Sequence, residues 1–101
     1  MWLFAMFDLP VDTKMARREY SRFRKKLLGE GFTMLQYSVY ARWYISEETC
    51  ETCRRFIRAY LPPEGQVRLL SVTDRQFEKM EIYLGISREP TEEPPVQVML
   101  F

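Results

Sequence analysis

The first ten residues, MWLFAMFDLP (residues 1–10), carry the clearest structural signal in the sequence. Seven apolar residues run directly into Asp8, and Leu9 and Pro10 then end the segment. This composition and length predict a β-strand over residues 2–9. Odd- and even-numbered positions are both apolar, which is typical of a strand covered on both faces. Asp8 continues the even-numbered face, so the question is why such an apolar strand ends on a carboxylate.

Composition limits the classes of protein to consider. The chain has 101 residues, enough for one domain with a modest core, and 47% of its residues are hydrophobic, too many for a disordered protein. The net charge of +1 predicts no particular partner. Histidine is absent from the sequence, which excludes Ser-His-Asp and Cys-His catalysis and any zinc site with histidine ligands.

The N-terminal apolar segment is too short for a signal peptide or a membrane span, and no basic segment precedes it. We therefore expect a cytoplasmic protein with no membrane partner. Its two cysteines, Cys50 and Cys53 in the sequence CETC, are then expected to be reduced. Zinc would require two further ligands, so the favoured interpretation is a pair of small buried apolar side chains.

Two helices are predicted after the first strand. Asp12 or Thr13 is a candidate N-cap for a helix that runs to about residue 28, and glycines follow it. Its apolar residues recur at helical spacing: Ala16, Tyr20, Phe23 and Leu27. Ser46 begins the second helix in the sequence SEET, which resembles a capping box with Thr49 at its last position. The expected apolar face of this second helix contains Cys53, Ile57, Tyr60 and Leu61, before a Pro-Pro pair ends it.

Strands fill the remaining positions. Residues 32–44 are rich in aromatic and β-branched residues and are long for one strand, so we predict strands near 32–36 and 38–44 with a bend or bulge between them. A strand at 66–73, a turn or short helix, and a short strand within 80–84 follow. This order predicts an α+β, ferredoxin-like split βαβ fold (βαββαβ plus small C-terminal strands) over residues 1–85.

The sequence changes in character after Gly85. Residues 86–95 contain three prolines and three glutamates, as an extended linker does. Five of the six residues 96–101, VQVMLF, are apolar, and we expect this segment to form a strand that docks on a sheet of this chain or of a partner.

A second copy of the chain would explain the first strand. A ferredoxin-like sheet carries helices on one face only, so an apolar opposite face favours a homodimer. Two Asp8 carboxylates facing each other could then hold Mg²⁺ or another divalent cation such as Mn²⁺, together with water and phosphate oxygens. The alternative is that Asp8 accepts backbone N–H bonds in the turn before Pro10.

The first helix is unusually basic. Seven of its residues are cationic: Lys14, Arg17, Arg18, Arg22, Arg24, Lys25 and Lys26. Those outside the apolar stripe could bind nucleic-acid phosphates, or they could form an ordinary solvated helix face. Aromatic residues of the strand pair could stack on bases, although strand aromatics more often belong to a core or an interface. These aromatic residues are Tyr37, Tyr40, Trp43 and Tyr44.

The segments FDLP, GFTMLQYSVYAR, LLSVTDRQF and VQVMLF, in this order and around the basic helix, resemble CRISPR-associated protein 2, the small subunit of CRISPR adaptation, most closely in the branch that accompanies type II systems. The resemblance implies a ferredoxin-like homodimer in which Asp8 binds a divalent metal shared between the copies. Phe7 stands where the family often has tyrosine. The resemblance further implies nucleic-acid contacts from Arg17, Arg18 and Arg22, with Ser38 and Tyr40 as further backbone or phosphate contacts. Lys25 and Lys26 of the same basic helix are predicted to join them.

The resemblance also implies a function in antiviral defence. Members of this family are described as metal-dependent endonucleases that act on single-stranded RNA or double-stranded DNA. They also bridge dimers of the CRISPR-associated protein 1 integrase during spacer acquisition. A non-catalytic DNA-binding scaffold is the alternative. A small-molecule regulatory module is a third hypothesis, but the sequence marks no polar pocket for it.

Overall fold

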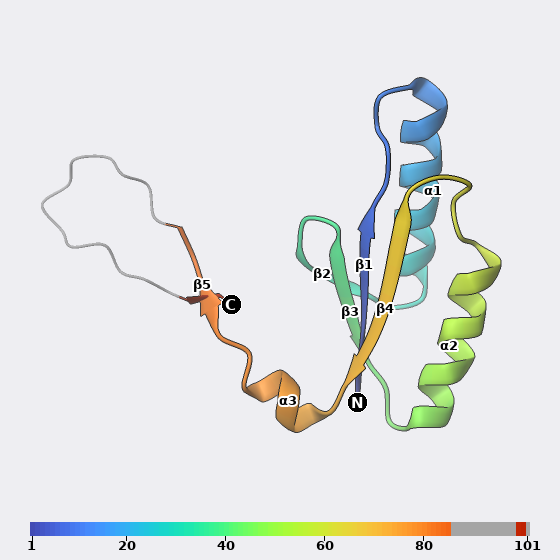
Figure 1. Ribbon diagram of the computed structural model, residues 1–101. Helices are drawn as coiled ribbons and strands as arrows, with labels where there is room; N and C mark the ends of the chain where they lie inside the picture. The colour runs from blue at the N-terminus through green and yellow to red at the C-terminus, as the bar shows by residue number, and fades with distance from the viewer. Residues whose placement is uncertain (86–98, 101) are drawn as a thin grey trace, which may run out of the picture.

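The chain forms an antiparallel sheet with two long helices on one face (Figure 1). The computed structural model describes residues 1–85 and 99–100. Its elements follow in the order β1 (Trp2–Asp8), α1 (Lys14–Gly29), β2 (Thr33–Gln36), β3 (Val39–Trp43), α2 (Glu47–Ala59), β4 (Gln66–Val72), α3 (Asp74–Glu78), β5 (Ile82–Tyr83) and β6 (Met99–Leu100). The four main strands lie in the order β2-β3-β1-β4, and each neighbouring pair is antiparallel. The predicted α+β, ferredoxin-like fold is confirmed.

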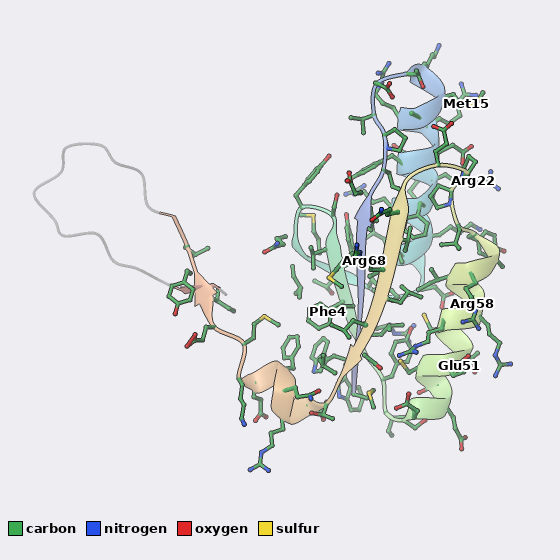
Figure 2. All side chains as sticks on the ribbon, viewed as in Figure 1. Phe4, Met15, Arg22, Glu51, Arg58 and Arg68 are labelled. Carbon is green, nitrogen blue, oxygen red and sulfur yellow. The ribbon has the colours of Figure 1, made fainter. Side chains whose placement is uncertain are left out.

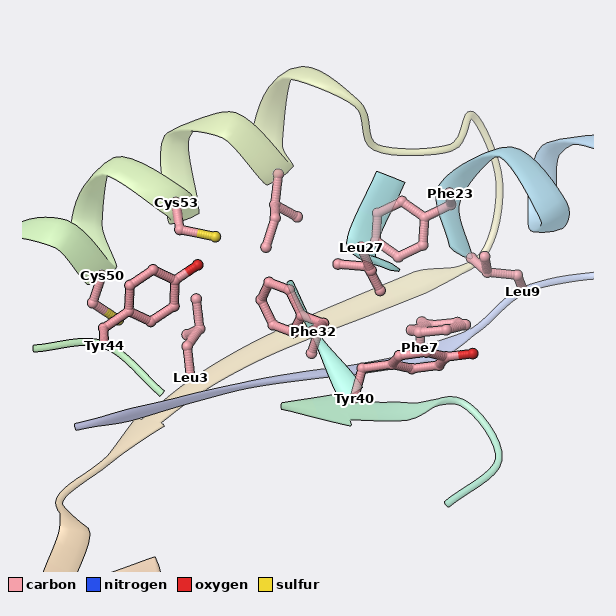
Figure 3. Close-up of a cluster of buried hydrophobic side chains, with 12 residues drawn as sticks. Leu3, Phe7, Leu9, Phe23, Leu27, Phe32, Tyr40, Tyr44, Cys50 and Cys53 are labelled. Atoms are coloured by element: carbon pink, nitrogen blue, oxygen red, sulfur yellow. The ribbon is translucent and has the colours of Figure 1, made fainter. Parts of the chain in front are cut away.

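β1 lies between β3 and β4 in the sheet, and its odd-numbered face is buried. Its odd-numbered residues Leu3 and Ala5 are fully buried, and Phe7 is 7% exposed. They pack with Phe23 and Leu27 of α1 and with residues of α2 in one core between the helices and the sheet (Figure 3). The core therefore uses the odd face of β1, and both helices cover that face.

Local sequence signals set most element boundaries. The side chain of Thr13 caps α1 by accepting a hydrogen bond of 2.9 Å from the Ala16 N–H. Ser46 and Thr49 form the predicted capping box at the start of α2. The break between β2 and β3 also lies where the sequence placed it. Tyr37 and Ser38 separate the two strands, and Ser38 has a φ of 63°. The register shift lies earlier, inside β2 between Met34 and Gln36.

The end of the second helix differs from the expectation. α2 ends at Ala59, three residues before the first proline, and Tyr60 and Leu61 are 38% and 48% exposed. The predicted apolar face of α2 is correct for Cys53 and Ile57 but wrong for these last two residues. Proline disfavours helical backbone in the residue before it, so the chain leaves the helix before it can turn Leu61 into the core.

The opposite face of the sheet carries the even-numbered residues of β1. The ring of Trp2 stacks on Phe77 of α3 with centroids 4.0 Å apart. The centroid of the Phe4 ring lies 5.9 Å from that of Phe77. α3 therefore covers one end of this face. Leu70, paired with Phe4 across β1 and β4, remains 51% exposed. We call the surface of Phe4, Met6, Arg68 and Leu70 the open face. The described chain itself does not cover it, as the sequence led us to expect.

β6 pairs antiparallel with β5, and these two strands form a separate small sheet. The predicted linker at 86–95 lies outside the described residues, as do all of residues 96–101 except those of β6. Among the described residues, none of the helices is both long enough and apolar enough to span a membrane.

Candidate metal and nucleic-acid site

Asp8 is the last residue of β1 and is exposed on the open side of the sheet. It pairs with Gln66 of β4, as Met6 pairs with Arg68, and side chains two residues apart on a strand share a face. The carboxylate therefore continues the face that carries Phe4 and Met6. Figure 2 shows Phe4 on the side of the sheet away from the helices. The position of Asp8 on the even face of β1 is as predicted.

The backbone around Asp8 is held from two sides. The Phe7 N–H donates a hydrogen bond of 3.0 Å to the carbonyl of Ser38 in the turn between β2 and β3. On the other side Gly65, with a φ of +93°, lies against the Asp8 peptide. A Cβ at position 65 would lie 2.6 Å from the Asp8 carbonyl oxygen and 2.8 Å from Cδ2 of Leu9. Glycine is therefore required here by both its conformation and its lack of a side chain.

A single chain supplies one carboxylate for a metal ion. The described residues contain no group of three or more Asp, Glu, Cys or His side chains that could hold a metal. Mg²⁺ is typically bound through one or two carboxylates, with water and substrate phosphates completing the coordination. Asp8 therefore fits half of such a site, and a second copy that brings its own Asp8 would supply the other half.

Aromatic side chains support the end of β1 from the helix side. Phe7 stacks on Tyr40 with ring centroids 5.5 Å apart. It also meets the rings of Phe23 and Tyr20 edge-on, with centroids 5.2 and 5.7 Å away. Tyr40 is 1% exposed, and its hydroxyl accepts a hydrogen bond of 2.9 Å from Nε of Arg24. Phe7 and Tyr40 thus lie in the core behind Asp8, where they fix the strand.

Four of the five cationic residues that were predicted to contact nucleic acid lie together along the outer side of α1. Arg18, Arg22, Lys25 and Lys26 recur at positions i, i+4, i+7 and i+8, which share one side of a helix. They line an open hollow of about 640 Å³ whose wall also includes Phe56 of α2. We call this hollow the basic groove. The Lys26 ammonium also lies 4.1 Å from the centroid of the Tyr60 ring, outside the lining of the groove.

Arg17 lies apart from the basic groove. Its Nη1 donates a hydrogen bond of 3.1 Å to the carbonyl of Val11, in the loop between β1 and α1. The fold also separates the groove from Asp8, because α1 covers one face of the sheet and Asp8 projects from the other. Figure 2 shows Arg22 on the helix side of the molecule. Within one chain, the candidate metal ligand and the candidate phosphate-binding residues therefore lie on two distinct surfaces.

Ser38 and Tyr37 occupy the turn beside Asp8. The Ser38 hydroxyl lies 3.2 Å from the Tyr20 hydroxyl, and the Tyr37 ring stacks on Tyr20 with centroids 6.2 Å apart. The neighbouring Tyr20 phenol raises the pKa of the Tyr37 phenol above its usual value. The sequence offered Tyr37 as one of several aromatic residues. Its stacking on Tyr20 joins α1 to the turn between β2 and β3. The spacing of residues along the sequence does not predict this contact.

The cysteines of the CETC segment are free thiols within the core, as expected (Figure 3). Cys50 is fully buried and Cys53 is 4% exposed. Burial raises the pKa of the Cys53 thiol above its ordinary value, which lowers its reactivity. These thiols therefore act as core side chains in the described structure.

The family model described as "CRISPR associated protein Cas2" matches residues 1–80, most of the chain. The chain belongs to the Cas2 family. It is 50% identical over 101 residues to a protein of Parvibaculum lavamentivorans named "CRISPR-associated endoribonuclease Cas2", and the match covers the full length of both chains. Relatives with the same name from Flavobacterium psychrophilum and Paracidovorax avenae are 41% and 42% identical over the whole chain, with 88% and 94% of their own lengths covered.

Proposed function

We propose that this Cas2-family chain is a metal-dependent phosphodiester hydrolase of the endoribonuclease type that acts as a homodimer in CRISPR adaptation. The observation that carries the proposal is the position of Asp8. It is an exposed carboxylate on a firmly held backbone, at the end of an apolar sheet face that the described chain leaves open. The names of the relatives, which specify an endoribonuclease, support single-stranded RNA as the first substrate to test.

Each part of the chain has a separate task in this proposal. The open faces of two copies meet, and each copy contributes Asp8 as a ligand for Mg²⁺ or Mn²⁺. Such a cation, held by the two Asp8 carboxylates, would supply charge neutralisation at the scissile phosphate and a more acidic bound water. Gly65 and the Phe7–Ser38 hydrogen bond hold the Asp8 backbone in position. The cations of the basic groove bind phosphates away from the reaction.

A second candidate function is a DNA-binding scaffold that bridges dimers of the CRISPR-associated protein 1 integrase and needs no nuclease activity. The separation of the basic groove from Asp8 favours it, because the groove's cations, Arg18, Arg22, Lys25 and Lys26, can bind a DNA backbone without any metal. In this proposal the apolar C-terminal segment contacts the integrase. A type II system is the proposed context, and double-stranded DNA is the ligand.

The test compares Asp8→Ala and Asp8→Asn with Asp12→Ala, a control in the nearby exposed loop. Each purified protein is incubated with labelled single-stranded RNA and, separately, duplex DNA, with and without Mg²⁺. We expect cleavage that requires Mg²⁺, loss of about 100-fold or more in both Asp8 variants, and no change in the control. Equal cleavage by all variants would assign the activity to a contaminant. Spacer acquisition in cells that persists with Asp8→Ala would favour the scaffold function.

A further inference from the structure

Tyr37 presents an exposed aromatic ring at the turn between β2 and β3. Its side chain is 74% exposed, although aromatic rings normally gain from burial. The other aromatic residues of this segment are accounted for within the fold. Tyr40 and Tyr44 are 1% and 6% exposed, and Trp43 donates a 3.0 Å hydrogen bond from Nε1 to Asp74. Tyr37 has no comparable packing role on its outer face.

The ring of Tyr37 is nevertheless held in a defined orientation. It stacks on the Tyr20 ring with an interplanar angle of 21°. Tyr20 is itself fixed by an edge contact with Phe7 and by the hydroxyl of Ser38, 3.2 Å away. Ser38 has a left-handed φ of 63°, which shapes the turn that carries Tyr37. One face of the Tyr37 ring is thus supported and the rest is open to solvent, as a stacking platform requires.

Two arginines flank this platform on α1. Arg17 and Arg24 lie three residues before and four residues after Tyr20, so the three side chains share one flank of the helix. Arg24 uses Nε to bond the Tyr40 hydroxyl, and Arg17 uses Nη1 to bond the Val11 carbonyl. A guanidinium has five N–H donors, so both residues keep further donors for a phosphate. An aromatic ring beside anchored guanidinium groups matches a base and its neighbouring phosphates.

The platform is on a different side of the molecule from the open face. Tyr37 packs against Tyr20 of α1, so its ring is on the helix side of the sheet, whereas Asp8 and Leu70 are on the opposite side. A second copy docked on the open face therefore leaves Tyr37 accessible. The basic groove is also separate, because its residues occupy another side of α1.

We propose that Tyr37 stacks on an unpaired base of a single-stranded nucleic acid while Arg17 and Arg24 bind the adjoining phosphates. A base inside a duplex keeps both of its faces covered by its neighbours, so this surface selects single-stranded over double-stranded segments. The inference deepens the proposed nucleic-acid function but does not depend on metal-dependent cleavage. It assigns a strand-selective site to a surface distinct from both Asp8 and the basic groove.

The test measures binding by fluorescence anisotropy in EDTA, so that metal and cleavage play no part. The probes are oligouridine RNA and oligothymidine DNA of about ten nucleotides, abasic strands of the same length, and a duplex. We expect the full-length wild-type protein to prefer base-bearing strands over abasic ones. Tyr37→Ala should reduce that preference by about fivefold or more and leave duplex affinity unchanged. Comparison of the RNA and DNA strands shows which of the two the site favours.

Matched variants separate stacking from structural effects. Tyr37→Phe keeps the ring and should retain the preference. Tyr83→Ala removes another tyrosine, 51% exposed on β5, and should behave as wild type. Tyr37→Ala that weakens base-bearing, abasic and duplex ligands equally, or that changes none of them, would overturn the proposal. Binding is measured in EDTA, where no metal-dependent cleavage occurs. The result for Tyr37 is therefore independent of whether the Asp8 variants affect cleavage.

Discussion

At the scale of single residues, the conformation of the chain around Asp8 is set by its neighbours more than by Asp8 itself. Gly65 begins the return into β4 with a φ of +93° and lies against the Asp8 carbonyl. Ser38, with a φ of 63°, closes the other side by accepting the Phe7 N–H. Both residues are remote from Asp8 in sequence, so the predicted position of the carboxylate follows from β1 alone but its rigidity does not.

We predict that Gly65→Ala destabilises the protein by about 2 kcal/mol or more, because an L-residue is strained at this φ and its Cβ would meet backbone atoms of Asp8 and Leu9. Urea denaturation followed by circular dichroism measures the loss. Gly29→Ala is the matched control. Apart from its chain neighbours and the adjacent helix backbone, no atom lies within 4 Å of the position its Cβ would take, and alanine favours a helix, so stability should hold or rise. Equal stability of both variants would show that the Gly65 backbone relaxes freely.

At the scale of elements, α1 divides its surface among three tasks. Phe23 and Leu27 face the core, Arg18 and Arg22 line the basic groove, and Tyr20 supports Tyr37. Helical periodicity predicted the buried stripe directly. It also predicted a basic exposed surface. It could not separate the cations that line the groove from Arg17 and Arg24, because these two bond to partners in the β1–α1 loop and in β3.

We predict that Arg22→Gln weakens duplex DNA binding and lowers the magnitude of the slope of log affinity against log salt by about 0.9, the value for one lost phosphate contact. Affinity measured across a salt series gives this slope. Arg75→Gln, on α3 away from the groove, is the control and should keep the wild-type slope. A slope that is unchanged in Arg22→Gln would show that the groove is an ordinary solvated surface.

At the scale of the whole molecule, the sheet is covered unequally. The two long helices bury one face, whereas on the other α3 protects only the end that carries Trp2. The remaining apolar side chains and Asp8 occupy the same uncovered face. Isologous contact between two such faces would bury the apolar residues and bring together residues from both copies.

We predict that Leu70→Glu weakens self-association by at least about tenfold, because a charge would be buried at the centre of the contact. Sedimentation equilibrium over a range of protein concentrations measures the change. Leu28→Glu is the control, since Leu28 is 41% exposed on α1, on the helix side of the sheet. A wild-type protein that is monomeric at micromolar concentration would contradict both this prediction and a metal site shared between two copies.

Local sequence signals were enough to predict the order of the elements, the α+β fold, the caps of the two long helices, the break between β2 and β3, and the face of β1 that carries Asp8. These features depend on periodicity and on interactions between residues close in the chain. Four features required the folded arrangement: the exposure of Tyr60 and Leu61, the support of Asp8 by Gly65, the separation of the basic groove from Asp8, and the pairing of Tyr37 with Tyr20. Each of these depends on how distant segments meet in space, which local spacing does not encode.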